Sequence, residues 1–319
     1  DDGYKLSING KEVINTWQRN RMGARTYKLQ TKKDTVYKVV LEYFQGAGKA
    51  NITLRAGNFE RTNYNALANR VKDADVIVYV GGISPQLEGE EMPVNAPGFN
   101  GGDRTTILLP AVQTEMMKIL HATGKPVVFV MLTGSAIAIP WEDENIPAII
   151  NAWYGGQSAG TAVADVLFGD YNPAGRLPVT FYKSDNDLPG FSDYSMNNRT
   201  YRYFKGDALY PFGYGLSYTN FTYSAITTPA TVIKGKNITV SVTVKNTGKI
   251  NGEEVVQLYT AYNNIKELNP LKALKGFKRI ALKAGESKKV NFTLTPEQLS
   301  LIDEAGNAYQ PKEKLTISI

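Results

Sequence analysis

The first part of the chain alternates hydrophobic and polar residues in short runs. Residues 4–8 alternate up to an Asn-Gly pair at positions 9–10, which is typical of the tight turn in a β-hairpin. Two further runs, at 37–44 and 50–54, flank a glycine-containing turn and are predicted to be strands. Residues 1–57 are therefore predicted to form a β module that begins abruptly, in the middle of a strand or nearly so.

From residue 58 to about 182 the chain instead alternates helical and strand patterns. The predicted helices cover residues 64–72, 110–122 and 159–168, and the predicted strands cover 76–80, 127–132 and 148–153. Pro110 suits the first turn of its helix because its missing N–H needs no intrahelical partner there. The run at 127–132 is continuously apolar, as expected for a strand covered on both faces. This alternation predicts a mostly parallel sheet.

After an aromatic-rich, loop-like segment, strand patterns return from about residue 222 to 319. Short alternating strands over about 100 residues indicate an immunoglobulin-like sandwich. The predicted fold class is thus multidomain α/β plus all-β, in which a mostly parallel α/β sandwich is flanked by a partial β module and an immunoglobulin-like β-sandwich. The predicted domains are residues 1–57, 58–221 and 222–319.

Composition narrows the class of protein. The chain has 319 residues, of which 42% are hydrophobic and 21% charged, as in ordinary globular proteins of two or three domains. No apolar run is long enough to predict a membrane span. The net charge of +6 contains no basic block, so nucleic acid is not an expected partner. The absence of cysteine and the single histidine, His121, predict neither a metal site nor Ser-His-Asp catalysis, and no cofactor is expected.

The strand at 76–80 leads into an acidic loop that carries Glu88, Glu90 and Glu91. In open α/β sheets, ligands gather beyond the carboxyl ends of the strands. Neighbouring like charges favour the protonated form of a carboxyl, which is the form that a general acid needs. The loop is therefore a candidate for acid/base chemistry. A solvated acidic loop without catalytic function is the simpler alternative.

Arg104 follows the acidic loop, directly after a Gly-Gly-Asp turn. One interpretation is a salt bridge that holds the acidic loop through a charge-assisted hydrogen bond. The other is direct contact with a bound ligand, which makes Arg104 a candidate substrate-binding residue. Trp141, Trp153 and Tyr154 leave a similar choice open between stacking on a ligand ring and packing in the core.

Long motifs in the chain resemble glycoside hydrolase family 3. The stretch Ala152-Trp153-Tyr154-Gly155-Gly156-Gln157, together with residues 160–181, is similar to the second domain of that family. The following segments extend the resemblance: residues 201–204 and 209–221 match the family's next signature, residues 269–277 resemble its fibronectin type III-like domain, and residues 1–57 resemble the C-terminal half of a protective-antigen-like β module. The resemblance therefore covers essentially the whole chain.

The resemblance implies a retaining, exo-acting β-glycosidase that is secreted or periplasmic and hydrolyses terminal β-glucosides or β-xylosides. In this family the nucleophile is an aspartate on a (β/α)8 barrel, and the acid/base is usually a glutamate from the loop after a sandwich strand. Placing Leu87-Glu88 on the family pattern makes Glu88 the acid/base, with Glu90 and Glu91 as alternatives. Retention requires both carboxyl groups.

The chain departs from the family pattern because it contains no barrel. Ser192-Asp193-Tyr194 resembles the nucleophile motif only superficially, since it follows the sandwich. The chain is thus expected to be the C-terminal part of a glycosidase, inactive alone. Its expected partners are a glycoside or oligosaccharide substrate and the N-terminal barrel domain of the same protein. The alternative is a non-catalytic glycan-binding or scaffolding chain.

Overall fold

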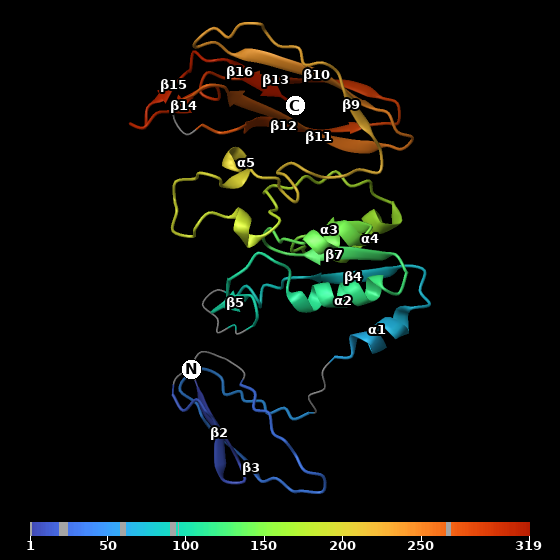
Figure 1. Cartoon of the computed structure of the whole chain (residues 1–319), viewed down its shortest axis with the longest axis vertical. Coiled ribbons are helices and arrows are strands. Elements are labelled where there is room, and N and C mark those ends of the chain that lie inside the picture. Colours follow the sequence, from blue (N-terminus) through green and yellow to red (C-terminus); the bar gives the residue numbers. More distant parts are fainter. Residues whose placement is uncertain (1, 19–24, 58–61, 90–93, 95, 266–268) are drawn as a thin grey trace. The chain divides into compact units, whose positions relative to one another are not determined.

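The computed structural model describes residues 2–18, 25–57, 62–89, 94, 96–265 and 269–319. The chain divides into two compact units, Asp1–Asn63 and Tyr64–Ile319 (Figure 1). The second unit contains an α/β part followed by an all-β part. The domain boundaries expected near residues 57 and 221 remain a prediction.

The first unit is a three-stranded antiparallel sheet in the order β2-β1-β3. Its strands are β1 (Gly3–Ile8), β2 (Lys11–Asn15) and β3 (Val39–Phe44). Asn9 and Gly10 connect β1 to β2 with φ angles of 50° and 78°. Positive φ at both central residues is what a tight hairpin turn of this kind requires. The predicted hairpin is confirmed.

The strand predicted at residues 50–54 is wrong. These residues have no regular secondary structure, and the side chains of Ile52 and Leu54 are 38% and 53% exposed. A strand needs a neighbouring backbone to take up its hydrogen bonds. Within the described residues of this unit, β3 pairs only with β1, so the alternating segment finds no partner.

The α/β part contains a parallel sheet in the order β4-β7-β8, and this confirms the predicted parallel pairing of the three strands. The strands are β4 (Ile77–Gly82), β7 (Val127–Leu132) and β8 (Ala148–Asn151), and the helices are α1 (Tyr64–Val71), α2 (Ala111–His121), α3 (Pro140–Asn145) and α4 (Ala159–Phe168). Helix α2 packs against β4 and β7. Pro110 is the N-cap residue of α2 rather than part of its first turn.

The middle strand and the edge strand of this sheet differ in burial. Strand β7 is buried along most of its length, with Phe129 and Met131 almost inaccessible, which explains its continuous apolar run. On β4, Ile77 is buried but Val78 and Val80 are 47% and 60% exposed. One face of β4 is therefore left uncovered by the described residues.

The all-β part consists of two three-stranded antiparallel sheets that share one hydrophobic core. One sheet contains β9 (Phe221–Tyr223), β10 (Ile238–Asn246) and β13 (Ser287–Leu294), the other contains β11 (Gly252–Tyr262), β12 (Ala273–Leu282) and β16 (Leu315–Ser318), and β14 (Leu301–Ile302) pairs with β15 (Ala308–Tyr309). The alternation seen in the sequence of β10 and β13 places one set of side chains in this core.

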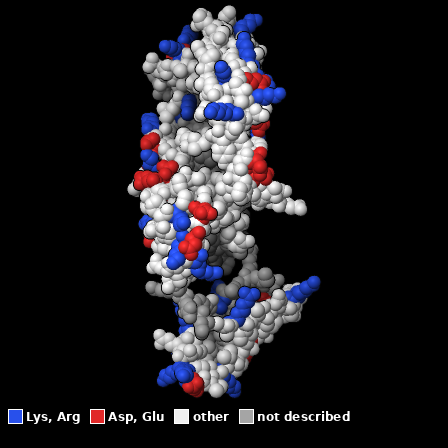
Figure 2. All heavy atoms as spheres, turned by 90° about the vertical axis from the view of Figure 1, so that its right-hand side faces the viewer, with Lys and Arg blue, Asp and Glu red and all other residues white. Residues whose placement is uncertain are grey.

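Several short elements lie within the α/β part or between it and the all-β part. They are the hairpin β5 (Phe99–Asn100) and β6 (Asp103–Arg104), the 3₁₀ turn at Asp185–Asp187 and helix α5 (Thr200–Tyr203). The sequence pattern did not predict them, because elements of two to four residues are too short to show a period. Basic and acidic side chains are interspersed on the face of the molecule in Figure 2.

Candidate active site

The backbone at Gly82, the last residue of β4, is held in place by its neighbours. Gly82 has a φ of 117°, and a Cβ there would lie 1.9 Å from the carbonyl oxygen of Leu132 on β7. The Gln113 amide from α2 donates to the Gly82 carbonyl (2.6 Å) and accepts from the Gly82 N–H (2.7 Å). Glycine is therefore required here, and the start of the acidic loop is held by both its sheet neighbour and its covering helix.

Glu88 lies where the carboxyl ends of the three parallel strands meet. It follows β4, and its carboxylate contacts one residue beyond β7 and one beyond β8. Ser135 Oγ donates to Glu88 Oε1 at 3.1 Å, and the Tyr154 hydroxyl lies 2.7 Å from Oε2. A Cβ on Gly134 would lie 2.7 Å from the Tyr154 ring, so glycine allows this close approach. The side chain of Glu88 is partly buried.

The hydrogen bonds of Tyr154 constrain the proton on Glu88. The Tyr154 oxygen lies 2.7 Å from both the Ile83 carbonyl oxygen and Glu88 Oε2, but a phenol has a single proton to donate. If Tyr154 donates to Ile83, Glu88 must itself carry the proton that makes the second bond. If Tyr154 donates to Glu88, Oε2 is an acceptor, as in an ionised carboxylate. The hydroxyl can therefore accommodate both protonation states of the carboxyl.

Tyr154 stays neutral over a wide range of pH. Burial, followed by the hydrogen bond to Glu88 and its negative charge, raises the pKa of Tyr154 to about 12. The preceding residue, Trp153, has a φ of 54°, which is uncommon for a bulky side chain and bends the chain just after β8. This bend lies between the strand and the hydroxyl that contacts Glu88.

Arg104 reaches Glu88 indirectly. Its Nη1 donates to Ser135 Oγ (3.0 Å) and to the Ala136 carbonyl (3.1 Å), and its Nε donates to the Thr106 carbonyl (3.2 Å). Burial lowers the pKa of Arg104, while the charge of Glu88 acts in the opposite direction. Among the described residues no direct Arg104–Glu88 ion pair is formed. The structure thus brings the two predicted site residues together through Ser135.

Two residues at this edge, Arg104 and Asn151, have buried polar atoms without a partner among the described residues. Across the described part of the chain such atoms are Arg104 Nη2, both side-chain amide atoms of Asn151 and Thr180 Oγ1. Asn151 is the last residue of β8, and Arg104 ends β6. Unpaired buried polar groups are costly, so most in native proteins are satisfied by something. Arg104 and Asn151 are accordingly candidates for contact with a further group.

The sequence did not identify Ser135 or Asn151, and it noted Tyr154 only as a possible stacking residue. Asn151 ends a parallel strand, and Ser135 and Tyr154 each lie three residues beyond the end of one, so the rule that placed Glu88 could have found them. Trp153 packs edge-on against Phe181 with ring centroids 6.2 Å apart, which favours the core-packing interpretation for it. Glu90 and Glu91 lie outside the described residues.

Comparison with known proteins defines the class. Residues 5–218 match the Glycosyl hydrolase family 3 C-terminal domain, and residues 254–319 match a Fibronectin type III-like domain. The chain belongs to glycoside hydrolase family 3, as its motifs predicted. No helix within the described residues is long and apolar enough to cross a membrane.

The relatives are glycosidases. A "Xylan 1,4-beta-xylosidase" of Xylanibacter ruminicola is 51% identical over 97% of this chain and 36% of its own length. A "Periplasmic beta-glucosidase" of Salmonella typhimurium is 40% identical over 72% of this chain and 30% of its own length. The solved beta-glucosidase from Kluyveromyces marxianus in complex with glucose has a TM-score of 0.74 at 28% identity, over 99% of this chain and 40% of that one. The chain thus spans about a third of the length of the curated relatives.

Proposed function

We propose that the chain supplies the acid/base loop of a retaining, exo-acting β-glycosidase, with Glu88 as the acid/base and the nucleophile on a barrel domain elsewhere in the same protein. The observation that carries the proposal is the position of Glu88, a partly buried carboxyl held by Ser135 and Tyr154 at the meeting point of three parallel strands. Ser135 and Tyr154 offer this carboxyl hydrogen-bond partners in both its protonated and its ionised state.

The two hydroxyl partners suit both steps of a double displacement. In the first step, protonated Glu88 gives its proton to the departing glycosidic oxygen. Tyr154 then turns its proton from the Ile83 carbonyl to Oε2, and Ser135, backed by the Arg104 guanidinium, continues to donate to Oε1. In the second step, the carboxylate takes a proton from the attacking water, and Tyr154 returns its proton to Ile83. In this account Arg104 positions Ser135 through its Nη1.

The polar atoms without partners give a second line of support. Arg104 Nη2 and the Asn151 amide are buried beside a sheet edge, and a sugar hydroxyl or a neighbouring domain would satisfy them. The substrate is a terminal β-xyloside or β-glucoside. The 51% identity to a xylan 1,4-beta-xylosidase favours the xyloside, and the periplasmic relative favours a periplasmic or secreted location.

The role of Glu88 can be tested by varying the leaving group of the substrate. In the protein that carries this chain together with its barrel, Glu88→Ala should slow glycosides with poor leaving groups far more than activated aryl glycosides, which need no protonation. Equal loss on both kinds of substrate would contradict the role of Glu88. Residues 1–319 alone should show no turnover, and measurable turnover would contradict the proposal that the nucleophile lies on another domain.

A further inference from the structure

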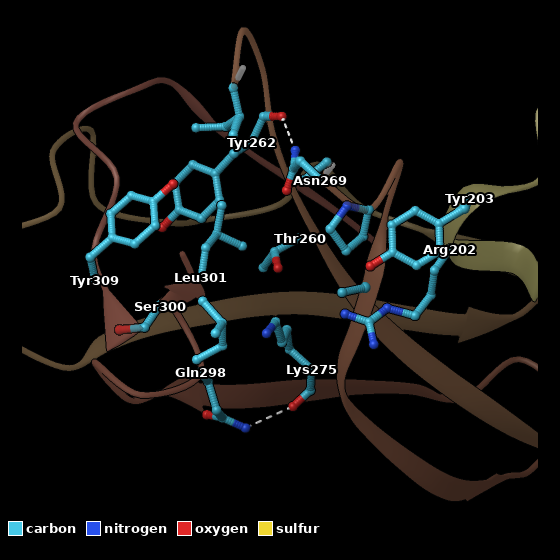
Figure 3. Close-up of a pocket in the computed structure, with 15 residues that line it drawn as sticks. Arg202, Tyr203, Thr260, Tyr262, Asn269, Lys275, Gln298, Ser300, Leu301 and Tyr309 are labelled. Carbon is cyan, nitrogen blue, oxygen red and sulfur yellow. Dashed lines mark hydrogen bonds between the residues drawn. The ribbon is translucent and has the colours of Figure 1, made fainter. Parts of the chain in front are cut away.

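A pocket lies far along the chain from Glu88, between helix α5 and the all-β part. Its volume is about 220 Å³, and it is lined by Arg202 and Tyr203 of α5 and by residues of β11, β12 and the segment near β14 (Figure 3). This volume is below the roughly 300–1,000 Å³ of sites for drug-sized ligands. The pocket is therefore suited to a single sugar ring or a small anion.

Backbone and side-chain hydrogen bonds fix the walls of the pocket. The Leu271 N–H donates to the Arg202 carbonyl (2.6 Å), and the Leu274 N–H donates to the Tyr201 hydroxyl (3.1 Å), so α5 is held against β12. On the opposite side, the Asn269 amide donates to the Tyr262 carbonyl (2.7 Å). The pocket is thus formed by ordered elements before any ligand enters.

Two cations face this pocket. The charged ends of Arg202 and Lys275 both point into it (Figure 3). Within the described residues neither forms an ion pair with a carboxylate. Burial lowers the pKa of Lys275, and the nearby Arg202 charge lowers it further. Glu313 acts on Tyr262, whose pKa it helps to raise after burial, but it makes no ion pair with either cation in the described structure.

Arg202 is exposed and Lys275 is partly buried, and a bound anion would reduce the repulsion between their two like charges. A carboxylate suits the planar fork of an arginine. The remaining lining suits a sugar, because Tyr203, Tyr262 and Tyr309 provide ring faces and hydroxyl groups. We infer that this pocket binds the carboxylate of an acidic sugar, either free or as a side group on a polysaccharide. The inference does not depend on the role of Glu88.

The test is the binding of small ligands to the 319-residue chain, measured by isothermal titration calorimetry. Glucuronate is the probe, glucose tests the need for charge, and inorganic phosphate tests the need for the sugar. A xylo-oligosaccharide that carries a glucuronic acid side group shows whether the pocket prefers the acidic sugar on a polysaccharide or the free acid. Glucuronate or the oligosaccharide should bind, glucose and phosphate should bind more weakly, and the pKa of Lys275 should rise on binding.

Charge-neutral variants show whether the pocket is responsible. Lys275→Met and Arg202→Gln should each weaken glucuronate binding at least about tenfold, because each removes a charge-assisted hydrogen bond. The exposed Lys289→Met on β13 is the matched control and should bind normally. Thermal unfolding of each variant shows that it is folded. Three results would each overturn the inference. They are the absence of glucuronate binding by the parent chain, phosphate binding as tight as glucuronate binding, and unchanged glucuronate binding in Lys275→Met.

Discussion

Two arginines in this chain serve two different carboxylates. Arg176, in the α/β part, pairs directly with Glu254 of β11 at 2.8 Å, and the two side chains are only 12% and 9% exposed. Arg104 reaches Glu88 only through Ser135, and its Nη2 is buried with no partner among the described residues. Both arginines are well ordered by carbonyl groups as well as by acidic or hydroxyl partners.

The difference between a direct ion pair and an indirect contact distinguishes a structural interaction from a candidate catalytic site. In the Arg176–Glu254 pair the charges neutralise each other, so the pair fixes how the α/β part meets the all-β part and has no reason to change. At Glu88 the carboxyl is held by two hydroxyl groups and keeps the freedom to gain or lose a proton. Because Arg104 contacts Glu88 only through Ser135, it supports the carboxylate without forming the direct ion pair that would hold the carboxylate ionised. The four predictions that follow test this contrast.

The largest effect is expected at Glu88. In the protein with its barrel, Glu88→Gln should lower kcat/KM for unactivated glycosides by about 10²–10⁴-fold, the range for loss of general acid–base catalysis. Glu90→Gln and Glu91→Gln are the matched comparisons from the same loop and should lose much less. A larger loss in either of them than in Glu88→Gln would transfer the acid/base role to that residue.

Breaking the buried ion pair should affect stability instead of catalysis. Arg176→Met leaves Glu254 buried without its partner, which should lower the free energy of unfolding by about 3–5 kcal/mol. The neighbouring pair Arg279–Glu253 joins β12 to β11 and is more exposed, so Arg279→Met should cost less than about 1 kcal/mol. Urea denaturation measures both. Equal losses would show that burial does not distinguish the two pairs.

Tyr154→Phe should have an intermediate effect on catalysis. It removes one hydrogen bond to Glu88, which predicts a loss in kcat of about 10- to 100-fold with little change in KM. Tyr171 makes a similar hydrogen bond to Glu253 (2.8 Å), so Tyr171→Phe is the matched control and should leave kcat unchanged. If the two variants behave alike, the Tyr154 hydroxyl has no catalytic part.

The smallest effect concerns alkaline pH. The pKa of Tyr154 is raised from 10.0 to about 12, so above pH 10 the unfolded chain releases this proton first. The stability from this group is complete below pH 10 and is lost as the pH rises toward about 12. Absorbance titration of tyrosinate should therefore show one group fewer near pH 12 in folded Tyr154→Phe than in the parent chain. An identical titration of the two proteins would contradict the shielding of Tyr154.

Local chemistry made part of this structure predictable. The Asn9-Gly10 turn, the helix that ends at Gly169 and the position of Glu88 after β4 all depend on residues close together in the chain. The contacts of Glu88 with Ser135 and Tyr154 join residues 47 and 66 positions apart, and they follow from the alignment of strands and the bend at Trp153. No sequence period encodes that alignment. The incorrect strand at 50–54 has the same cause, because a partner strand cannot be inferred from alternation alone.

The most direct test of the central claim is the product formed by Glu88→Ala in the presence of azide. Azide needs no general base, so it can attack the covalent glycosyl–enzyme intermediate that the variant resolves slowly with water. The account predicts faster turnover of an activated aryl xyloside and a glycosyl azide of β configuration, identified by NMR. Unchanged turnover with only free sugar as product would contradict Glu88 as the acid/base.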